Sequence, residues 1–97
     1  MGEISRHILV MGRVQGVGYR AWLAEQGTQR GLRGWVRNRL AGSVEAVCIG
    51  DADAIAGMIA ACRDGPAMAR VERLHERDAT TEELKLASDD FRTLPTV

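Results

Sequence analysis

Gly12 to Arg20 reads GRVQGVGYR and follows directly on the apolar run His7 to Met11. Three glycines fall within seven residues of this stretch, and an arginine then opens a helix-like segment. Glycine has no Cβ, so its backbone can adopt positive φ and come close to a ligand. Successive amide N–H groups ahead of a helix N-terminus form a concave anion site, and a guanidinium adds a planar fork for phosphate oxygens. The stretch therefore predicts a strand, a phosphate or carboxylate cradle and a helix, in that order.

Two other glycine motifs do not account for these residues. A Walker loop needs a lysine followed by Ser or Thr after its last glycine, and neither is present there. Gly16, Gly18 and Ala21 fit the dinucleotide fingerprint. However, Asn38 stands where that motif places an acidic residue, and 97 residues are too few for a doubly wound sheet. The residues alone also allow a turn that binds nothing.

The composition predicts one domain over residues 1–97. Hydrophobic residues make up 45% of the chain, which is enough for a small core. Lys plus Arg equals Asp plus Glu at 13 each, and there are only two Trp, one Tyr and one Phe, so neither nucleic acid nor a membrane surface is an expected partner. No apolar segment has the length of a signal-peptide core or a membrane span, which favours a cytoplasmic protein.

The cysteines and histidines do not form a metal-binding pattern. Cys48 and Cys62 are 14 positions apart, with no companion thiol or histidine at zinc-ligand spacing. We expect both to be small hydrophobic core residues. His7 and His75 lie in separate strand-like runs, and we expect structural or surface roles for them. No metal is predicted.

The chain divides into strand-like and helix-like segments. The expected strands are 7–13, 34–38, 43–49, 69–75 and a short edge strand at 91–94, and the expected helices are 20–30 and 52–64. Asp51 is a suitable N-cap for the second helix, and Gly65 followed by proline ends it. The β-α-β-β-α-β order predicts an α+β fold, a ferredoxin-like sandwich with a four- to five-stranded antiparallel sheet and two helices on one face.

The first helix has an unusual packing face. Leu23, Gly27 and Arg30 share one side by the i, i+4, i+7 rule. Glycine inside a helix costs about 1 kcal/mol relative to alanine. Its missing side chain would, in return, let this helix sit close to the sheet.

Two segments resemble the acylphosphatase family. Val14–Arg20 (VQGVGYR) matches the family's V-Q-G-V-x-[FY]-R loop after the first strand. Gly31–Asn38 (GLRGWVRN) matches its G-L-x-G-W-V-x-N segment entering the hairpin. Arg20 and Asn38 stand 18 positions apart, about the family's spacing. The resemblance covers roughly residues 7 to 76 and implies the βαββαβ fold that the order of segments predicts independently.

The resemblance also implies an activity and a role for each matched residue. The substrate phosphate is expected on the loop amides and on the arginine, at Gln15, Gly16, Val17, Gly18, Tyr19 and Arg20. Asn38 is expected to orient the attacking water. The implied reaction is metal-independent hydrolysis of the carboxyl–phosphate anhydride of a small acyl phosphate, giving a carboxylate and inorganic phosphate. No cofactor and no covalent enzyme intermediate are implied, and we expect a monomer.

Two other functions stay open at this point. Hydrogenase-maturation carbamoyltransferases have a similar N-terminal domain, so the chain could be a carbamoyl-phosphate-processing module of a larger protein. A non-enzymatic anion- or ligand-binding domain of the same topology is the second alternative. Turnover of acetyl phosphate separates the enzyme from the binding domain.

Overall fold

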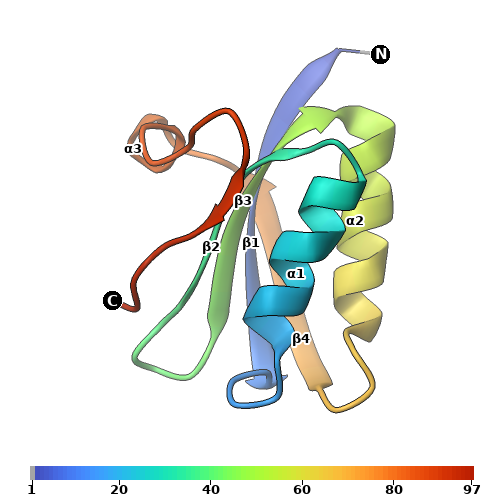
Figure 1. The fold of residues 1–97 in the computed structure, drawn as a ribbon, viewed down its shortest axis with the longest axis vertical. Coiled ribbons are helices and arrows are strands. Elements are labelled where there is room, and N and C mark those ends of the chain that lie inside the picture. The colour runs from blue at the N-terminus through green and yellow to red at the C-terminus, as the bar shows by residue number, and fades with distance from the viewer. Residues whose placement is uncertain (1) are drawn as a thin grey trace.

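The computed structural model describes residues 2–97 and has the predicted βαββαβ order followed by a short helix and an edge strand (Figure 1). The strands are β1 (Glu3–Arg13), β2 (Arg33–Asn38), β3 (Val44–Asp51), β4 (Arg70–Asp78) and β5 (Phe91–Thr93). The helices are α1 (Tyr19–Gln29), α2 (Ala52–Asp64) and α3 (Thr81–Leu84). No helix among residues 2–97 has the length and apolar character needed to cross a bilayer.

The five strands form one sheet in the order β4-β1-β3-β2-β5. The four long strands pair antiparallel, as the sequence predicts, whereas β5 runs parallel to β2 and makes the sheet mixed. The direction of β5 follows from the register. β4 ends beside Arg6, at the end of the sheet where β2 begins at Arg33 opposite Ile49. After β4 the chain crosses the sheet at this end and begins β5 at the far edge, beside the start of β2. β5 therefore runs in the same direction as β2.

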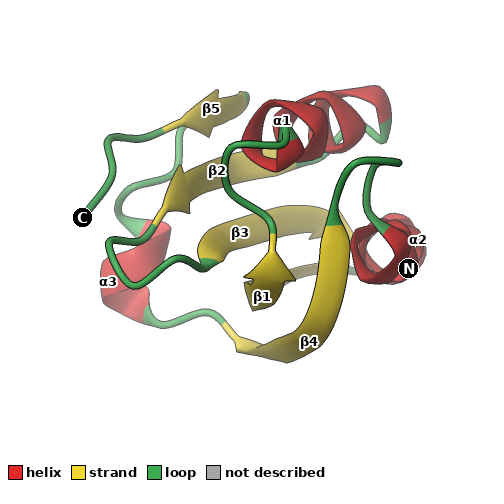
Figure 2. Ribbon diagram, turned by 90° about the horizontal axis from the view of Figure 1, so that it is seen from below, coloured by secondary structure: helices red, strands yellow, loops and turns green. Residues whose placement is uncertain are grey.

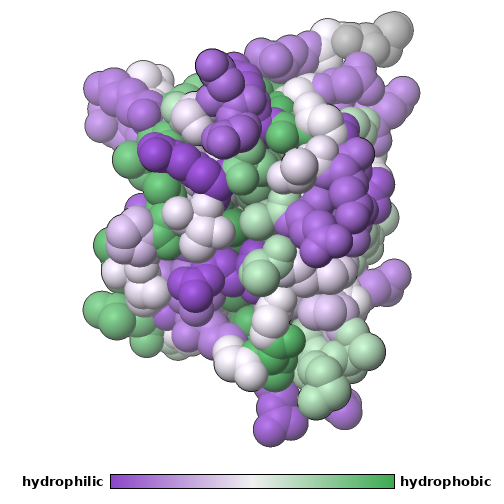
Figure 3. Space-filling view, in the orientation of Figure 1, coloured by the Kyte–Doolittle hydropathy of each residue, from purple (hydrophilic) through white to green (hydrophobic). Residues whose placement is uncertain are grey.

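Helices α1 and α2 cover one face of the sheet, and α3 lies on the other side (Figure 2). Side chains alternate between the two faces of a strand, so each strand contributes to both. The main core lies under the two long helices and includes Ile8, Val10, Val36, Val44, Cys48, Leu23, Ile55 and Cys62. Trp35, Val47 and Ile49 form a smaller cluster with side chains of residues 79–94. The outer surface of the helical layer carries mainly hydrophilic residues, with hydrophobic ones in small separate groups (Figure 3).

The second helix and the cysteines confirm the sequence predictions. Asp51 caps α2 by accepting a hydrogen bond from the Asp53 N–H, and the helix ends at Gly65. Cys48 and Cys62 are free thiols in the core. Burial raises the pKa of Cys62 to about 11, so this thiol stays protonated and unreactive at neutral pH.

Gly27 allows the close approach of α1 that the sequence predicts. A Cβ at this position would lie 2.5 Å from Cδ2 of Phe91, the buried residue of β5. Arg30 does not join the packed face: it is exposed, and its guanidinium lies 3.1 Å from the position of a Cβ at Gly57 on α2. The contact of α1 with the sheet edge therefore depends on glycine and a phenyl ring.

We expect Gly27→Ala to lower the free energy of unfolding by up to about 2 kcal/mol, although alanine is the better helix former. Overpacking against a buried ring costs about 1–3 kcal/mol, which exceeds the gain in propensity of about 1 kcal/mol. Urea unfolding measures the difference. Gly57→Ala in α2 is the matched control, because its new Cβ meets only the flexible end of Arg30, and it should be neutral or stabilising. A Gly27→Ala variant as stable as Gly57→Ala would contradict this account.

Candidate active site

A pocket of about 200 Å³ lies where the end of β1, the start of α1 and the end of β2 meet. Val44 of β3 pairs with Val10 of β1 on one side and with Asn38 of β2 on the other, so the pairing of β3 with both strands ends at the same level of the sheet, and β1 continues beside β4 to Arg13. The loop after β1 then reaches the end of β2. The pocket is lined by Val14, Gln15, Gly16, Gly18, Tyr19, Arg20, Ala21 and Asn38.

The loop between β1 and α1 presents unpaired backbone donors. Gly16 and Gly18 have φ of 76° and 81°, which lie in the left-handed region that favours glycine. No side chain caps the first turn of α1. Within residues 2–97, the N–H groups of residues 15 to 20 donate no hydrogen bond to other protein groups. A run of free N–H groups at a helix N-terminus attracts an anion. Val17 contributes its backbone to this loop, whereas its side chain packs against the main core.

Arg20 brings a positive charge into the pocket. Its side chain is half-buried and makes no hydrogen bond or ion pair with any described residue. Arg37, Arg39 and Arg77, by contrast, all bind carboxylates. An unpaired guanidinium has its full set of donors available for a bound anion.

Asn38 is the last residue of β2 and reaches the same pocket. Its Oδ1 is buried and has no hydrogen-bond donor among residues 2–97. An unsatisfied buried acceptor costs about 1–3 kcal/mol, so such atoms are rare and call for an explanation. A water or substrate group that donates a hydrogen bond to Oδ1 would explain this unsatisfied acceptor.

Comparison with known proteins shows which family the chain belongs to. The family model for acylphosphatase matches residues 6–93. A protein of Azorhizobium caulinodans named acylphosphatase is 53% identical over 91 residues, which are 94% of this chain and 95% of that relative. The chain belongs to the acylphosphatase family. The family and the enzyme class predicted from the sequence are thereby confirmed.

Solved structures extend the likeness to the fold. An acylphosphatase from Coxiella burnetii matches with a TM-score of 0.85 at 32% identity, over 95% of this chain and 93% of that one. The T. kodakarensis protein HypF matches with a TM-score of 0.77 at 27% identity, over 92% of this chain but 11% of its own. The acylphosphatase fold therefore also occurs as a small part of a longer protein, which is the arrangement that the module alternative assumes.

The tyrosine of the acylphosphatase loop has a packing role. Tyr19 is buried, its ring centroid lies 5.2 Å from that of Trp22, and its hydroxyl donates a 2.6 Å hydrogen bond to the carbonyl of Cys62. Burial raises the pKa of Tyr19, so the phenol stays neutral. Trp35 is fully buried and donates its indole N–H to the carbonyl of Glu83. Both tryptophans therefore have packing roles.

The side chain of Gln15 makes hydrogen bonds that the sequence analysis did not predict. The sequence assigns its backbone amide to the phosphate, but its side chain donates hydrogen bonds to the carbonyls of Arg39 and Ser43, each at 2.8 Å. These partners lie 24 and 28 positions further along the chain. No local pattern could have indicated a contact that depends on the meeting of β1 and β2.

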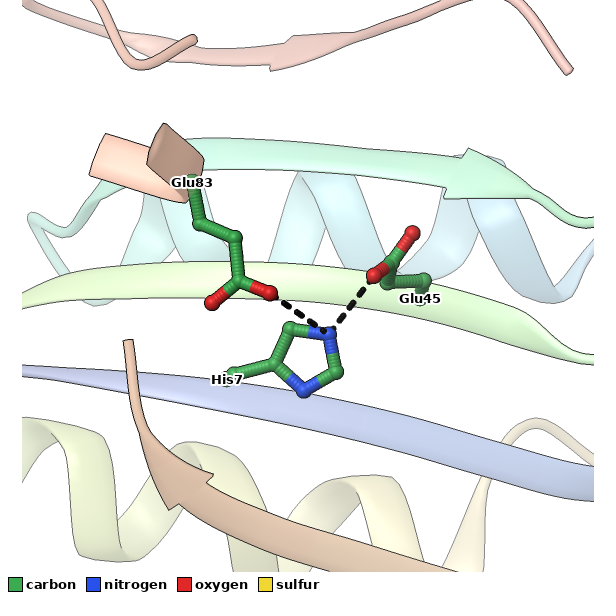
Figure 4. Close-up of side chains that lie close together, drawn as sticks. All are labelled: His7, Glu45 and Glu83. Carbon is green, nitrogen blue, oxygen red and sulfur yellow. Dashed lines mark hydrogen bonds and ion pairs between the residues drawn. The ribbon is translucent and has the colours of Figure 1, made fainter. Parts of the chain in front are cut away.

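A second cluster of ionisable groups lies on the sheet face opposite the two long helices. His7 Nε2 lies 2.7 Å from Glu45 Oε2 and 3.6 Å from Glu83 Oε2, between the two carboxylates (Figure 4). These three residues could in principle hold a cation. However, Arg37 and Arg39 both bind Glu45, and Arg77 binds both oxygens of Glu83.

The three guanidiniums determine whether this cluster can bind a metal cation. Together they already outweigh the two carboxylates, so a bound dication would add repulsion to a site with no spare negative charge. We assign the cluster to an ion network that joins β1, β2, β3, β4 and α3. His7 then has the structural role that the sequence analysis expects.

This network predicts a loss of stability in acid. Burial alone would raise the pKa of Glu45, but hydrogen bonds from His7 and Arg37 outweigh it and lower that pKa. The hydrogen bond from Arg77 lowers the pKa of Glu83 to about 2. Both groups bind fewer protons in the folded state than in the unfolded state. Their contribution to stability is therefore complete above the unfolded pKa of about 4.3 and is lost as the pH falls toward 2.

Urea unfolding between pH 7 and pH 2 measures this loss. Glu83→Gln should show a smaller decrease in unfolding free energy than the parent protein between pH 5 and about pH 2.5, because it lacks one of the two groups. Glu82→Gln is the control, since Glu82 is exposed and pairs only with the exposed Lys85. Parallel pH curves for the parent and Glu83→Gln would contradict the assignment.

Proposed function

We propose that this acylphosphatase hydrolyses small acyl phosphates in the pocket between the glycine loop and Asn38. The observation that carries the proposal is the meeting, in one pocket, of a guanidinium and a carboxamide oxygen that have no hydrogen-bond partner among residues 2–97. Free N–H groups of residues 15 to 20 complete the pocket. This set of groups suits the transfer of a phosphoryl group to water.

The phosphate binds to the loop amides and to Arg20. Phosphoryl transfer asks a protein mainly to position the reactants and to stabilise charge on the equatorial oxygens. Fixed N–H donors and one guanidinium provide this stabilisation without a metal ion. The substrate is thereby held with its phosphorus facing Asn38.

Asn38 orients the attacking water. Its Oδ1, which has no donor among residues 2–97, accepts a hydrogen bond from the water. A new bond forms between the water oxygen and phosphorus, and the bond between phosphorus and the acyl oxygen breaks. A carboxylate is a good leaving group, so no strong general acid is needed. The proton of the water passes to a phosphate oxygen, because a carboxamide is not a base at neutral pH.

Other aspects of the function stay predictions. These are the single domain over residues 1–97, the monomeric state, the cytoplasmic location, and the lack of a nucleic-acid partner, metal or cofactor. The chain spans 95% of the length of an acylphosphatase relative, and the module alternative stays open. The binding-domain alternative differs from the proposal in one measurable property, which is turnover.

A turnover assay tests the proposal directly. The protein should release phosphate from acetyl phosphate and benzoyl phosphate at a rate that does not change when a chelator is added. Inorganic phosphate should inhibit competitively, since it occupies the same loop. Phosphate binding without turnover would instead support the anion-binding domain, and activity lost on chelation and restored by a divalent ion would contradict the metal-independent mechanism.

A further inference from the structure

The Gln15 side chain joins the two halves of the pocket. Gln15 belongs to the loop that precedes Arg20, whereas Arg39 and Ser43 belong to the hairpin turn after Asn38. The two hydrogen bonds at 2.8 Å use both hydrogens of the same amide nitrogen. They are the only hydrogen bonds between this loop and this turn in the described part of the chain.

The turn that receives these bonds is itself well ordered. The Arg39 N–H donates to the Ser43 carbonyl at 2.9 Å, and the Gly42 N–H donates to the Arg39 carbonyl at 3.0 Å. Each of the two carbonyls that Gln15 contacts thus also closes the turn. Asn38 comes immediately before it and forms the last ladder pair of β2, with Val44. A shift of the turn relative to the loop therefore moves Asn38 relative to the phosphate.

Asn38 and its two neighbours also make contacts with residues outside the phosphate loop. Glu45 binds the side chains of Arg37 and Arg39, the two neighbours of Asn38, and belongs to the network on the opposite sheet face. The Val97 N–H donates to the Asn38 carbonyl at 3.3 Å. These contacts hold the hairpin to the rest of the sheet. They do not relate it to the phosphate loop.

We propose that the side chain of Gln15 is a positioning residue that sets the distance between Asn38 and the bound phosphate. It acts through the hairpin and is not itself a ligand of the phosphate. The inference rests on the proposed role of Asn38 as the residue that orients water. A displacement of about 1 Å in such a group can cost about 10²-fold in rate, so two neutral hydrogen bonds can have a large catalytic effect.

The test is a double-mutant cycle between Gln15→Met and Asn38→Ala. Methionine has nearly the length of glutamine but no N–H donor. In the parent background we expect Gln15→Met to lower kcat on benzoyl phosphate by about 10- to 10²-fold, with little change in KM and in the inhibition constant of inorganic phosphate. In the Asn38→Ala background the same substitution should cost less than about 2-fold, because the group that it positions has been removed.

Two further variants keep the result interpretable. Gln29→Met should leave kcat unchanged, because the Gln29 side chain lies on the exposed face of α1 and bonds to Glu25 alone among residues 2–97. Gln15→Asn keeps the amide but is one methylene too short to reach both carbonyls, and it replaces Gln15→Met in the cycle if the methionine variant does not fold.

Each outcome has a distinct meaning. If Asn38→Ala keeps full activity, the proposed role of Asn38 is wrong. If Asn38→Ala is slow and the two effects multiply, the positioning role of Gln15 is wrong while the role of Asn38 stands. If Gln15→Met raises the inhibition constant of phosphate by the factor that it removes from kcat/KM, Gln15 is a phosphate ligand, and the inference is overturned.

Discussion

Arg20→Ala should lower kcat/KM on acetyl phosphate by about 10²- to 10³-fold, the usual effect of removing one preorganised group that stabilises transition-state charge. The inhibition constant of inorganic phosphate should rise as well, because the guanidinium also binds the phosphate anion in the ground state. The fold should be unaffected, since Arg20 makes no hydrogen bond or ion pair with the described residues. Steady-state kinetics and urea unfolding on the same preparation measure the two effects separately.

Two comparisons make this result specific to the site. Arg20→Lys keeps the charge but loses the planar fork, so its activity should lie between those of the parent and Arg20→Ala. Arg13→Ala removes an exposed arginine at the end of β1, just outside the pocket lining, and should change kcat/KM less than about 2-fold. Equal losses of kcat/KM in the Arg13 and Arg20 variants would show that only general positive charge matters. A folded Arg20→Ala variant with parental activity would refute the assignment of Arg20 to the site.

Asn38→Ala should lower kcat by about 10²-fold or more while changing KM and phosphate inhibition little. The reason is that Asn38 meets the water in the transition state, whereas the phosphate is held by other groups. Benzoyl phosphate turnover under saturating conditions gives kcat, and competition with inorganic phosphate shows whether the loop is intact.

The stability of the same variant provides an independent check. Its free energy of unfolding should equal or exceed that of the parent, because the substitution removes a buried acceptor that has no donor among residues 2–97. Loss of activity together with unchanged or higher stability indicates a group retained for function. A large loss of stability would instead indicate that Asn38 is a structural residue of the hairpin.

Local signals in the sequence were sufficient for most elements of the fold. Asp51 and Gly65 predict both ends of α2, because a cap and a helix-ending glycine act within one turn of the helix. The ends of the strands were predicted less well. β1 begins at Glu3 rather than His7, and β4 continues to Asp78 rather than His75. Apart from Ile4 those extra residues are polar, most of them are exposed, and they are strand residues because they pair with β1, β3 or β4.

The sequence alone predicted Arg20 and Asn38 as site residues, because a glycine loop followed by an arginine indicates an anion site and the resemblance to the acylphosphatase family implies a role for Asn38. Only the tertiary structure brings the two into one pocket, because that depends on β3 pairing with both β1 and β2. The same holds for the parallel edge strand β5, for the ion network around Glu45 and for the link from Gln15 to the hairpin. Each of these joins residues that are far apart along the chain. Which of many distant partners a side chain or strand meets is decided by the order of strands in the sheet, and no pattern of neighbouring residues encodes that order directly.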